Sequence, residues 1–117
     1  MKFFQKRVDT IGRRHTAMVN VFKALSDSTR REILKLLKNG DMAAGEIADQ
    51  FNMSKPAITK HLDILRNAEL VTSRKVGVNV IYSINITVLQ ETLSDFLTYF
   101  ETKEFPDPLQ NKAKSEV

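Results

Sequence analysis

The sequence predicts one domain that is mainly α-helical and carries a single small β-hairpin. Apolar residues recur at helical spacing along most of the chain up to residue 100. Residues 71–84 instead alternate with a period of two on either side of a glycine, which is typical of two short strands. At 117 residues, the chain is long enough to bury a core without support from disulfides or metal ions.

The composition excludes several classes of protein. The chain contains no Cys, which excludes disulfides, thiolate metal sites and cysteine nucleophiles. It has no long apolar run and no secretory signal, so we expect a cytoplasmic protein. The net charge is +4, and residues 1–17 alone supply it, with five basic residues against one acidic residue. An argument for nucleic-acid binding must therefore rest on local charge.

Residues 2–25 can form one helix, because their apolar positions are separated by threes and fours as in a helix pair. Gly12 costs such a helix about 1 kcal/mol relative to alanine, so a break near Gly12 is plausible. A second helix is predicted over residues 30–39, with N-cap candidates in residues 26–29 and with Gly40 in a left-handed conformation at its end. Residues 41–44 are predicted to be a connector.

Residues 45–70 predict two short helices joined by a tight turn. Asn52 and Met53 break the first helix, and Ser54 is placed to cap the second, with Pro56 in its first turn. At about 100° per residue, the second helix has one apolar face and one polar, basic face. Such a polar face can donate hydrogen bonds to base edges and phosphates, so we interpret it as a DNA-recognition helix. Its candidate DNA-binding residues are Ser54, Lys55, Pro56, Thr59, Lys60, His61 and Arg66.

An ordinary corner of a helix bundle would show the same two helices. The segment that follows them argues against a bundle corner. The predicted hairpin turns at Gly77 and follows the second helix directly, as the wing of a winged helix-turn-helix does. From residue 54 to residue 75, five basic residues stand against two acidic ones. We expect Arg74, Lys75 and Asn79 of the wing to contact the minor groove or phosphates.

A last helix is predicted to start at a capping box of Thr87 and Gln90. Its apolar stripe is wider than a peripheral helix needs, which favours dimerisation over packing within one subunit. Its acidic residues are more simply a solvated face than metal ligands, because this helix contains no His. Beyond residue 104 the chain is mostly polar, and we expect a disordered tail. The candidate dimer-interface residues are Phe22, Leu89, Leu93, Phe96, Leu97 and Phe100.

These segments together resemble the arsenical-resistance-regulator (ArsR) family of bacterial winged-helix repressors, over about residues 20–100. The resemblance is carried by FKALSD with STR (residues 22–30), EIA (46–48), SKPAITKHL (54–62), LRNAELV (65–71) and the wing residues Arg74, Gly77, Tyr82 and Ile84. It implies a homodimer, paired through its first and last helices, that binds an inverted-repeat DNA operator and represses transcription, its own included. It divides the chain into a basic extension (1–17), a winged helix-turn-helix domain (18–103) and a tail (104–117).

Three positions depart from the family pattern. Metal-sensing and arsenite-sensing members carry a Cys-x-Cys pair where this chain has Ala43 and Gly45, so thiolate sensing is excluded and no metal or cofactor is expected. Glu69 replaces the usual glycine, so we expect the recognition helix to end without a left-handed residue. Val78 follows the wing glycine where a basic residue is common, which predicts a weaker grip on phosphate.

Several alternatives stay open at the level of sequence. For His61, a half-buried ring hydrogen-bonded within the domain is favoured over a phosphate contact, and metal ligation comes last. No arrangement of residues suggests catalysis, so the protein is not expected to be an enzyme. The rivals to an operator-binding repressor are a dimerisation or protein-interaction module that binds no DNA, and a repressor with a non-metal inducer. A protein or membrane-protein partner that relieves repression is a further open possibility.

Overall fold

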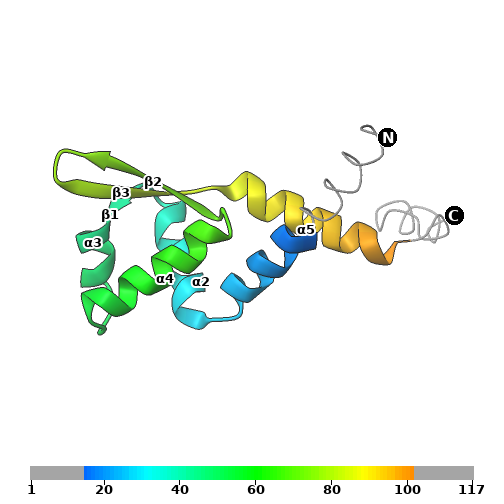
Figure 1. Cartoon of the computed structure of the whole chain (residues 1–117), viewed down its shortest axis with the longest axis horizontal. Coiled ribbons are helices and arrows are strands. Elements are labelled where there is room, and N and C mark those ends of the chain that lie inside the picture. The colour runs from blue at the N-terminus through cyan, green and yellow to red at the C-terminus, as the bar shows by residue number, and fades with distance from the viewer. Residues whose placement is uncertain (1–14, 102–117) are drawn as a thin grey trace, which may run out of the picture.

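The computed structural model describes residues 15–101 (Figure 1). A helix over residues 15–25 comes first, so the expected boundary after residue 17 falls inside a continuous helix; the expected tail, residues 104–117, lies outside the described residues. The elements that follow are α2 (Ser28–Lys38), β1 (Met42–Ala43), α3 (Ala44–Asp49), α4 (Lys55–Asn67), β2 (Val71–Val76), β3 (Asn79–Ile84) and α5 (Ile86–Phe100). The predicted mainly α fold with a β-hairpin is confirmed.

Side-chain caps fix where three of these helices begin. The Asp27 carboxylate accepts a hydrogen bond from the backbone N–H of Arg30 at 3.1 Å, at the start of α2. The Ser54 hydroxyl accepts from the backbone N–H of Ala57 at 3.3 Å, so its predicted role as the cap of α4 is confirmed. The predicted start of the last helix at Thr87 is wrong, because Asn85 caps α5 by accepting from the backbone N–H of Val88 at 3.4 Å.

The end of α4 also differs from expectation. Glu69 itself adopts the left-handed backbone, with φ of 61°. The N–H of Leu70 donates to the Leu65 carbonyl at 3.0 Å, and the N–H of Glu69 donates to the Arg66 carbonyl at 2.9 Å. This pair of bonds is the Schellman motif, which normally has glycine at the left-handed position. The prediction of an end without a left-handed residue was wrong, because these two bonds stabilise the turn around a non-glycine residue.

The sheet has three antiparallel strands in the order β1-β3-β2. The hairpin runs in register from Val71 opposite Ile84 to Val76 opposite Asn79, and Gly77 opens its two-residue turn with φ of 64°. The third strand is a correction to the predicted connector, because Met42 and Ala43 pair with Tyr82 and Ile81 of β3. Two residues are too few to show an alternating pattern in sequence.

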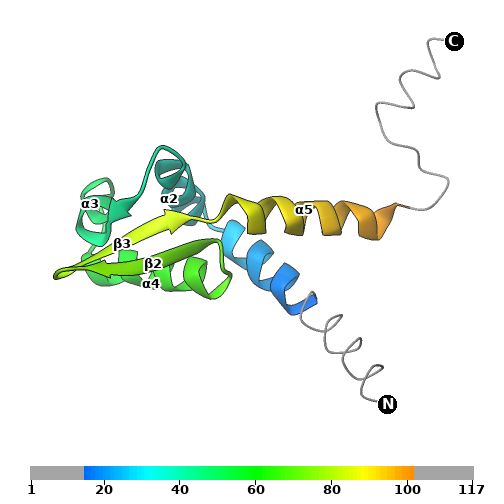
Figure 2. The same ribbon diagram turned by 90° about the horizontal axis from the view of Figure 1, so that it is seen from above.

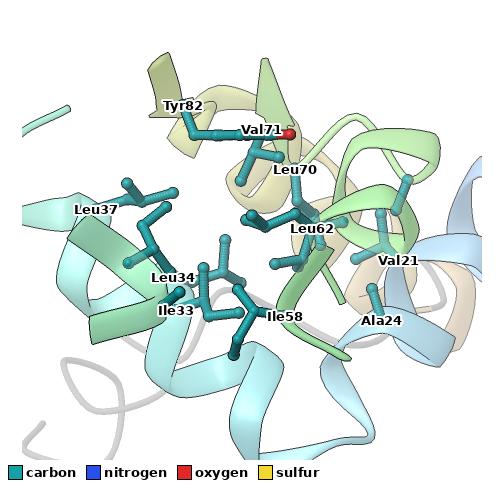
Figure 3. Packing of buried hydrophobic residues seen from close by; sticks show 14 residues of the cluster. Val21, Ala24, Ile33, Leu34, Leu37, Ile58, Leu62, Leu70, Val71 and Tyr82 are labelled. Atoms are coloured by element: carbon teal, nitrogen blue, oxygen red, sulfur yellow. The ribbon is translucent and has the colours of Figure 1, made fainter. Parts of the chain in front are cut away.

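One apolar core joins the helices to the sheet (Figure 3). Val21 and Ala24 of the first helix, Ile58 and Leu62 of α4, and Tyr82 of β3 all take part. The inner face of α4 is therefore the apolar face expected from its sequence. The rest of the buried apolar cluster is Ile33, Leu34, Leu37, Ile47, Ala48, Leu65, Ala68, Leu70 and Val71.

The described elements lie along one long axis (Figures 1 and 2). The tip of the hairpin, α3 and the start of α4 lie at one end. The helix of residues 15–25 and α5 extend from the other end. The candidate DNA-binding and dimer-forming elements therefore occupy opposite ends of the molecule.

Candidate DNA-recognition surface

The outward face of α4 begins at its N-terminus. Lys55, Pro56, Thr59 and Lys60 are all exposed, whereas Ile58 between them is 1% exposed and points to the core. Within the described residues, the side chains of Lys55, Thr59 and Lys60 form no hydrogen bond or ion pair. These donors are free to meet an external partner.

Two further candidates on this helix already have local roles. Ser54 is exposed, but its hydroxyl is the acceptor that caps α4. Arg66 lies 3.4 Å from the Asp63 carboxylate, and both side chains are about half exposed. An exposed pair of this kind contributes little to stability. Arg66 can therefore exchange Asp63 for a phosphate at small cost.

His61 lies at the edge of the buried face, and its side chain is 20% exposed. Its Nδ1 atom is 3.3 Å from Nη1 of Arg30 and 3.8 Å from the Asp27 carboxylate. The favoured interpretation of a half-buried ring hydrogen-bonded within the domain is confirmed. The pKa of Asp27 lies below its usual value, chiefly because the backbone N–H of Arg30 donates to this carboxylate.

The wing presents a mixed surface. Lys75 and Asn79 are exposed near its tip, and Val78 is fully exposed. Arg74, in contrast, donates to the Asp41 carboxylate at 3.1 Å and to the Ser83 hydroxyl at 3.0 Å. Sequence reasoning missed Asp41, which is 33 residues away and becomes a neighbour only because β1 joins the sheet.

The far end of the molecule carries an uncovered apolar stripe. Leu93, Leu97 and Phe100 of α5 are 40%, 61% and 62% exposed. Phe22 packs edge-on against Phe96 within the same chain, with ring centroids 4.7 Å apart. Leu89 is half-buried against the core, and Val19 and Ile86, which were not among the predicted interface residues, are also exposed. The i to i+7 spacing of Ile86 and Leu93 was the signal that could have found Ile86.

The described residues offer no metal site. Among residues 15–101, no three His, Cys, Asp or Glu side chains gather closely enough to hold an ion. In the same range no helix is both long and apolar enough to cross a membrane.

A recognition helix with an unpartnered basic face, followed by a β-hairpin wing, defines a winged helix-turn-helix DNA-binding protein. Residues 27–73 match the model of the family described as "Bacterial regulatory protein, arsR family". The chain is 54% identical to the transcriptional repressor SdpR of Bacillus subtilis, over 70% of this chain and 91% of that protein. The chain therefore belongs to the arsR family of DNA-binding transcriptional regulators, which are not enzymes.

Two further comparisons agree with this assignment. The arsenical resistance operon repressor of Staphylococcus aureus is 37% identical over 64% of this chain and 72% of its own length. The solved structure of an ArsR-like transcriptional regulator from Rhodococcus sp. RHA1 superposes with a TM-score of 0.67. That structure is 36% identical and covers 73% of this chain and 80% of its own.

Proposed function

We propose that this regulator is a homodimer that represses transcription, its own included, by binding an inverted-repeat operator. The observation that carries the proposal is the outward face of α4, where Lys55, Thr59 and Lys60 have no partner among the described residues. Lys and Thr side chains can donate to base edges in the major groove. Ser54, Pro56 and His61 flank this face, and Arg66 would contact phosphate.

The wing would provide the second contact. Lys75 and Asn79 are exposed near the hairpin tip, at the same end of the molecule as the start of α4 (Figure 1). We assign Lys75, Asn79 and Arg74 to phosphates or the adjacent minor groove. Arg74 would have to leave Asp41 for this contact, and both side chains of that pair are about half exposed.

The apolar stripe of α5 supports a dimer. Large apolar side chains in a row at the surface mark an interaction site. We propose that Leu93, Leu97 and Phe100 meet the same stripe of a second copy, with Phe22, Phe96 and Leu89 behind them. A two-fold axis would then place two recognition helices on half-sites whose centres are about 10 base pairs apart, or a multiple of that.

We further propose that repression does not depend on a metal ion. The chain has no Cys, and α5 has no His. The alternative function is a dimerisation or protein-interaction module that binds no DNA. The outward lysines of α4 favour DNA over that module, because a helix with another use has no need of them.

The test is footprinting of the purified protein on the promoter region of its own gene, with added zinc and with a chelator. We expect one protected inverted repeat and the same affinity in both conditions. A tenfold change in affinity with zinc would contradict metal independence, and absence of protection in that promoter region would contradict repression of its own gene and favour the module that binds no DNA.

Two variants test which residues read the bases. Lys60→Ala should weaken the cognate site by about 1–3 kcal/mol and relax base preference at one symmetric pair of positions. Arg74→Ala should weaken cognate and random duplexes alike, because a phosphate contact carries no sequence information. If both variants lower binding to both duplexes by the same factor, the outward face of α4 does not read the bases.

A further inference from the structure

Arg30 is a buried charged side chain, only 9% exposed, in the first turn of α2. Its guanidinium contacts two other helices. Nε donates to the carbonyl of Ala24 at 2.8 Å and Nη2 donates to the carbonyl of Lys23 at 3.0 Å. Nη1 is 3.3 Å from Nδ1 of His61 on α4. One side chain therefore joins the helix of residues 15–25 to the recognition helix.

The contacts with Lys23 and Ala24 explain why the charge can be buried. These two carbonyls belong to the last turn of the first helix, where carbonyl groups have no partner within the helix. The Lys23 carbonyl also accepts from the N–H and the hydroxyl of Ser26, at 3.2 Å and 2.6 Å. The partial negative charge at a helix C-terminus also favours a cation there. Arg31 caps the same turn, donating to the Leu25 carbonyl at 2.8 Å, but it is exposed and forms no hydrogen bond with α4. Arg31 therefore only caps the first helix, whereas Arg30 caps that helix and also contacts α4.

The contact with His61 depends on the protonation of the imidazole. A guanidinium has only donors, so this contact is a hydrogen bond in the form of the ring whose Nδ1 carries no proton and accepts. The Asp27 carboxylate lies 3.8 Å from the same Nδ1. Within the described residues these two groups, Arg30 and Asp27, are the charged groups that face Nδ1.

The apolar contacts between the two helices are less directional. Val21 and Ala24 share one core with Ile58 and Leu62 (Figure 3). The hydrophobic effect is itself non-directional, whereas hydrogen bonds weaken steeply off their preferred geometry. Lys55 lies six residues before His61 and thus about 9 Å away along α4. A rotation of about 10° around His61 would move Lys55 by about 1.5 Å, more than the ~0.5 Å that a binding site tolerates.

We propose that Arg30 is a positioning residue for DNA recognition: through His61 it holds α4 at one orientation to the helix of residues 15–25. In a dimer paired through that helix and α5, this orientation determines which spacing of half-sites both recognition helices can occupy. The inference rests on the proposed function, because it requires a dimer on an inverted repeat.

The experiment is selection of binding sites from a random duplex library by the full chain and by Arg30→Gln, with Arg31→Gln as the matched control. The unchanged protein and Arg31→Gln should both select inverted repeats of a single spacing. Arg30→Gln should select the same half-site sequence over several spacings, and it should bind the best-spaced site about tenfold more weakly, since a hydrogen bond to a charged group is lost. A dimeric Arg30→Gln that selects the same single spacing with unchanged affinity overturns the proposal.

His61→Phe separates positioning from folding, because it keeps a ring of similar shape and leaves the two carbonyl contacts of Arg30 in place. It should broaden the selected spacing as Arg30→Gln does, and an unchanged spacing overturns the proposal. Nitrogen NMR of the unchanged protein on its selected duplex gives a test without any variant, and Nδ1 of His61 should be an unprotonated acceptor. A protonated Nδ1 overturns the proposal, whereas failure of the unchanged protein to select any site would overturn the proposed function instead.

Discussion

Glu69 ends the recognition helix in a left-handed conformation that usually belongs to glycine. The left-handed conformation destabilises a residue with a Cβ by about 1–2 kcal/mol. Substitution by glycine removes this cost, but the larger backbone entropy of glycine in the unfolded state offsets part of the gain in stability. Glu69→Gly should therefore stabilise the protein by about 1 kcal/mol, measured by urea unfolding. Glu69→Ala, which removes the charge and keeps the strain, should change stability by less than about 0.5 kcal/mol. Loss of stability in the glycine variant would mean that the Glu69 side chain itself stabilises the turn.

The ionisation of Asp27 makes the folding stability of the protein depend on pH, and the direction of its pKa shift gives the sign of that dependence. Its pKa is lower in the folded protein than its usual 3.8, so its charged form contributes stability that is present above 3.8 and is lost as pH falls through the folded pKa. Asparagine caps a helix as well as aspartate does but carries no charge. Asp27→Asn should therefore be less stable than the unchanged protein at pH 7, and the difference should vanish as the pH falls below 3.8 and through the lower pKa of the folded protein. Urea unfolding across that range is the measurement, and a constant difference would show that the charge of Asp27 is not involved.

At the scale of elements, the wing is joined to β1 by an ion pair that competes with DNA. Arg74 and Asp41 are 55% and 46% exposed, so their pair is worth no more than about 1 kcal/mol to the fold. Asp41→Asn should free Arg74 and remove a negative charge, and thus strengthen binding to cognate and random duplexes alike by a few fold, about 0.5–1 kcal/mol. The measurement is fluorescence anisotropy with both duplexes. Asp63→Asn, which frees Arg66 on α4, should strengthen binding to both duplexes in the same way.

If Asp41→Asn leaves both affinities unchanged while Arg74→Ala lowers them, Arg74 reaches phosphate without being released from Asp41. If neither variant changes binding, Arg74 belongs to the fold and not to the DNA-binding surface.

The elements that the sequence predicts best are those with a repeated pattern. The two faces of α4 and the alternation around Gly77 each extend over several turns or strand positions, so single exceptions do not hide them. β1 was missed because two residues cannot show a period. The start of α5 was predicted at Thr87 instead of Asn85 because both residues are good N-caps. Which of them caps the helix depends on where the chain leaves β3. The N–H of Asn85 donates to the Leu70 carbonyl at 2.8 Å.

The candidate site was predictable only in part, for a related reason. The outward positions of α4 follow from helical geometry alone, and they are exposed as expected. His61, which contacts Arg30, and Asp41, which pairs with Arg74, are 31 and 33 residues away in sequence from these arginines. Contacts of this kind depend on how the elements pack, and no local spacing encodes them.

At the scale of the whole molecule, the apolar stripe of α5 allows the dimer to be broken without unfolding a protomer. Leu97 is 61% exposed in one chain, so Leu97→Asp costs the protomer little, but in a dimer it would bury a charge. Phe96 is a poorer choice, because it packs on Phe22 of its own chain. Light scattering should report a monomer for Leu97→Asp with unchanged helical content. Thr98→Asp, about 100° around the helix, should remain a dimer; a dimeric Leu97→Asp would place the interface elsewhere.

The salt dependence of DNA binding measures how many phosphates the proposed dimer contacts. Each protomer offers Lys55, Lys60 and Lys75 as exposed cations, and Arg66 and Arg74 when they leave Asp63 and Asp41. Since each neutralised phosphate contributes about −0.9 to the slope of log affinity against log salt, the dimer should show a slope of about −5 to −9. The monomeric Leu97→Asp variant should show about half of that slope, because it keeps the same surface of one protomer. Fluorescence anisotropy over a range of salt concentrations measures both slopes. Equal slopes for dimer and monomer would mean that only one protomer of the dimer contacts the duplex, and the inverted-repeat operator would then have to be abandoned.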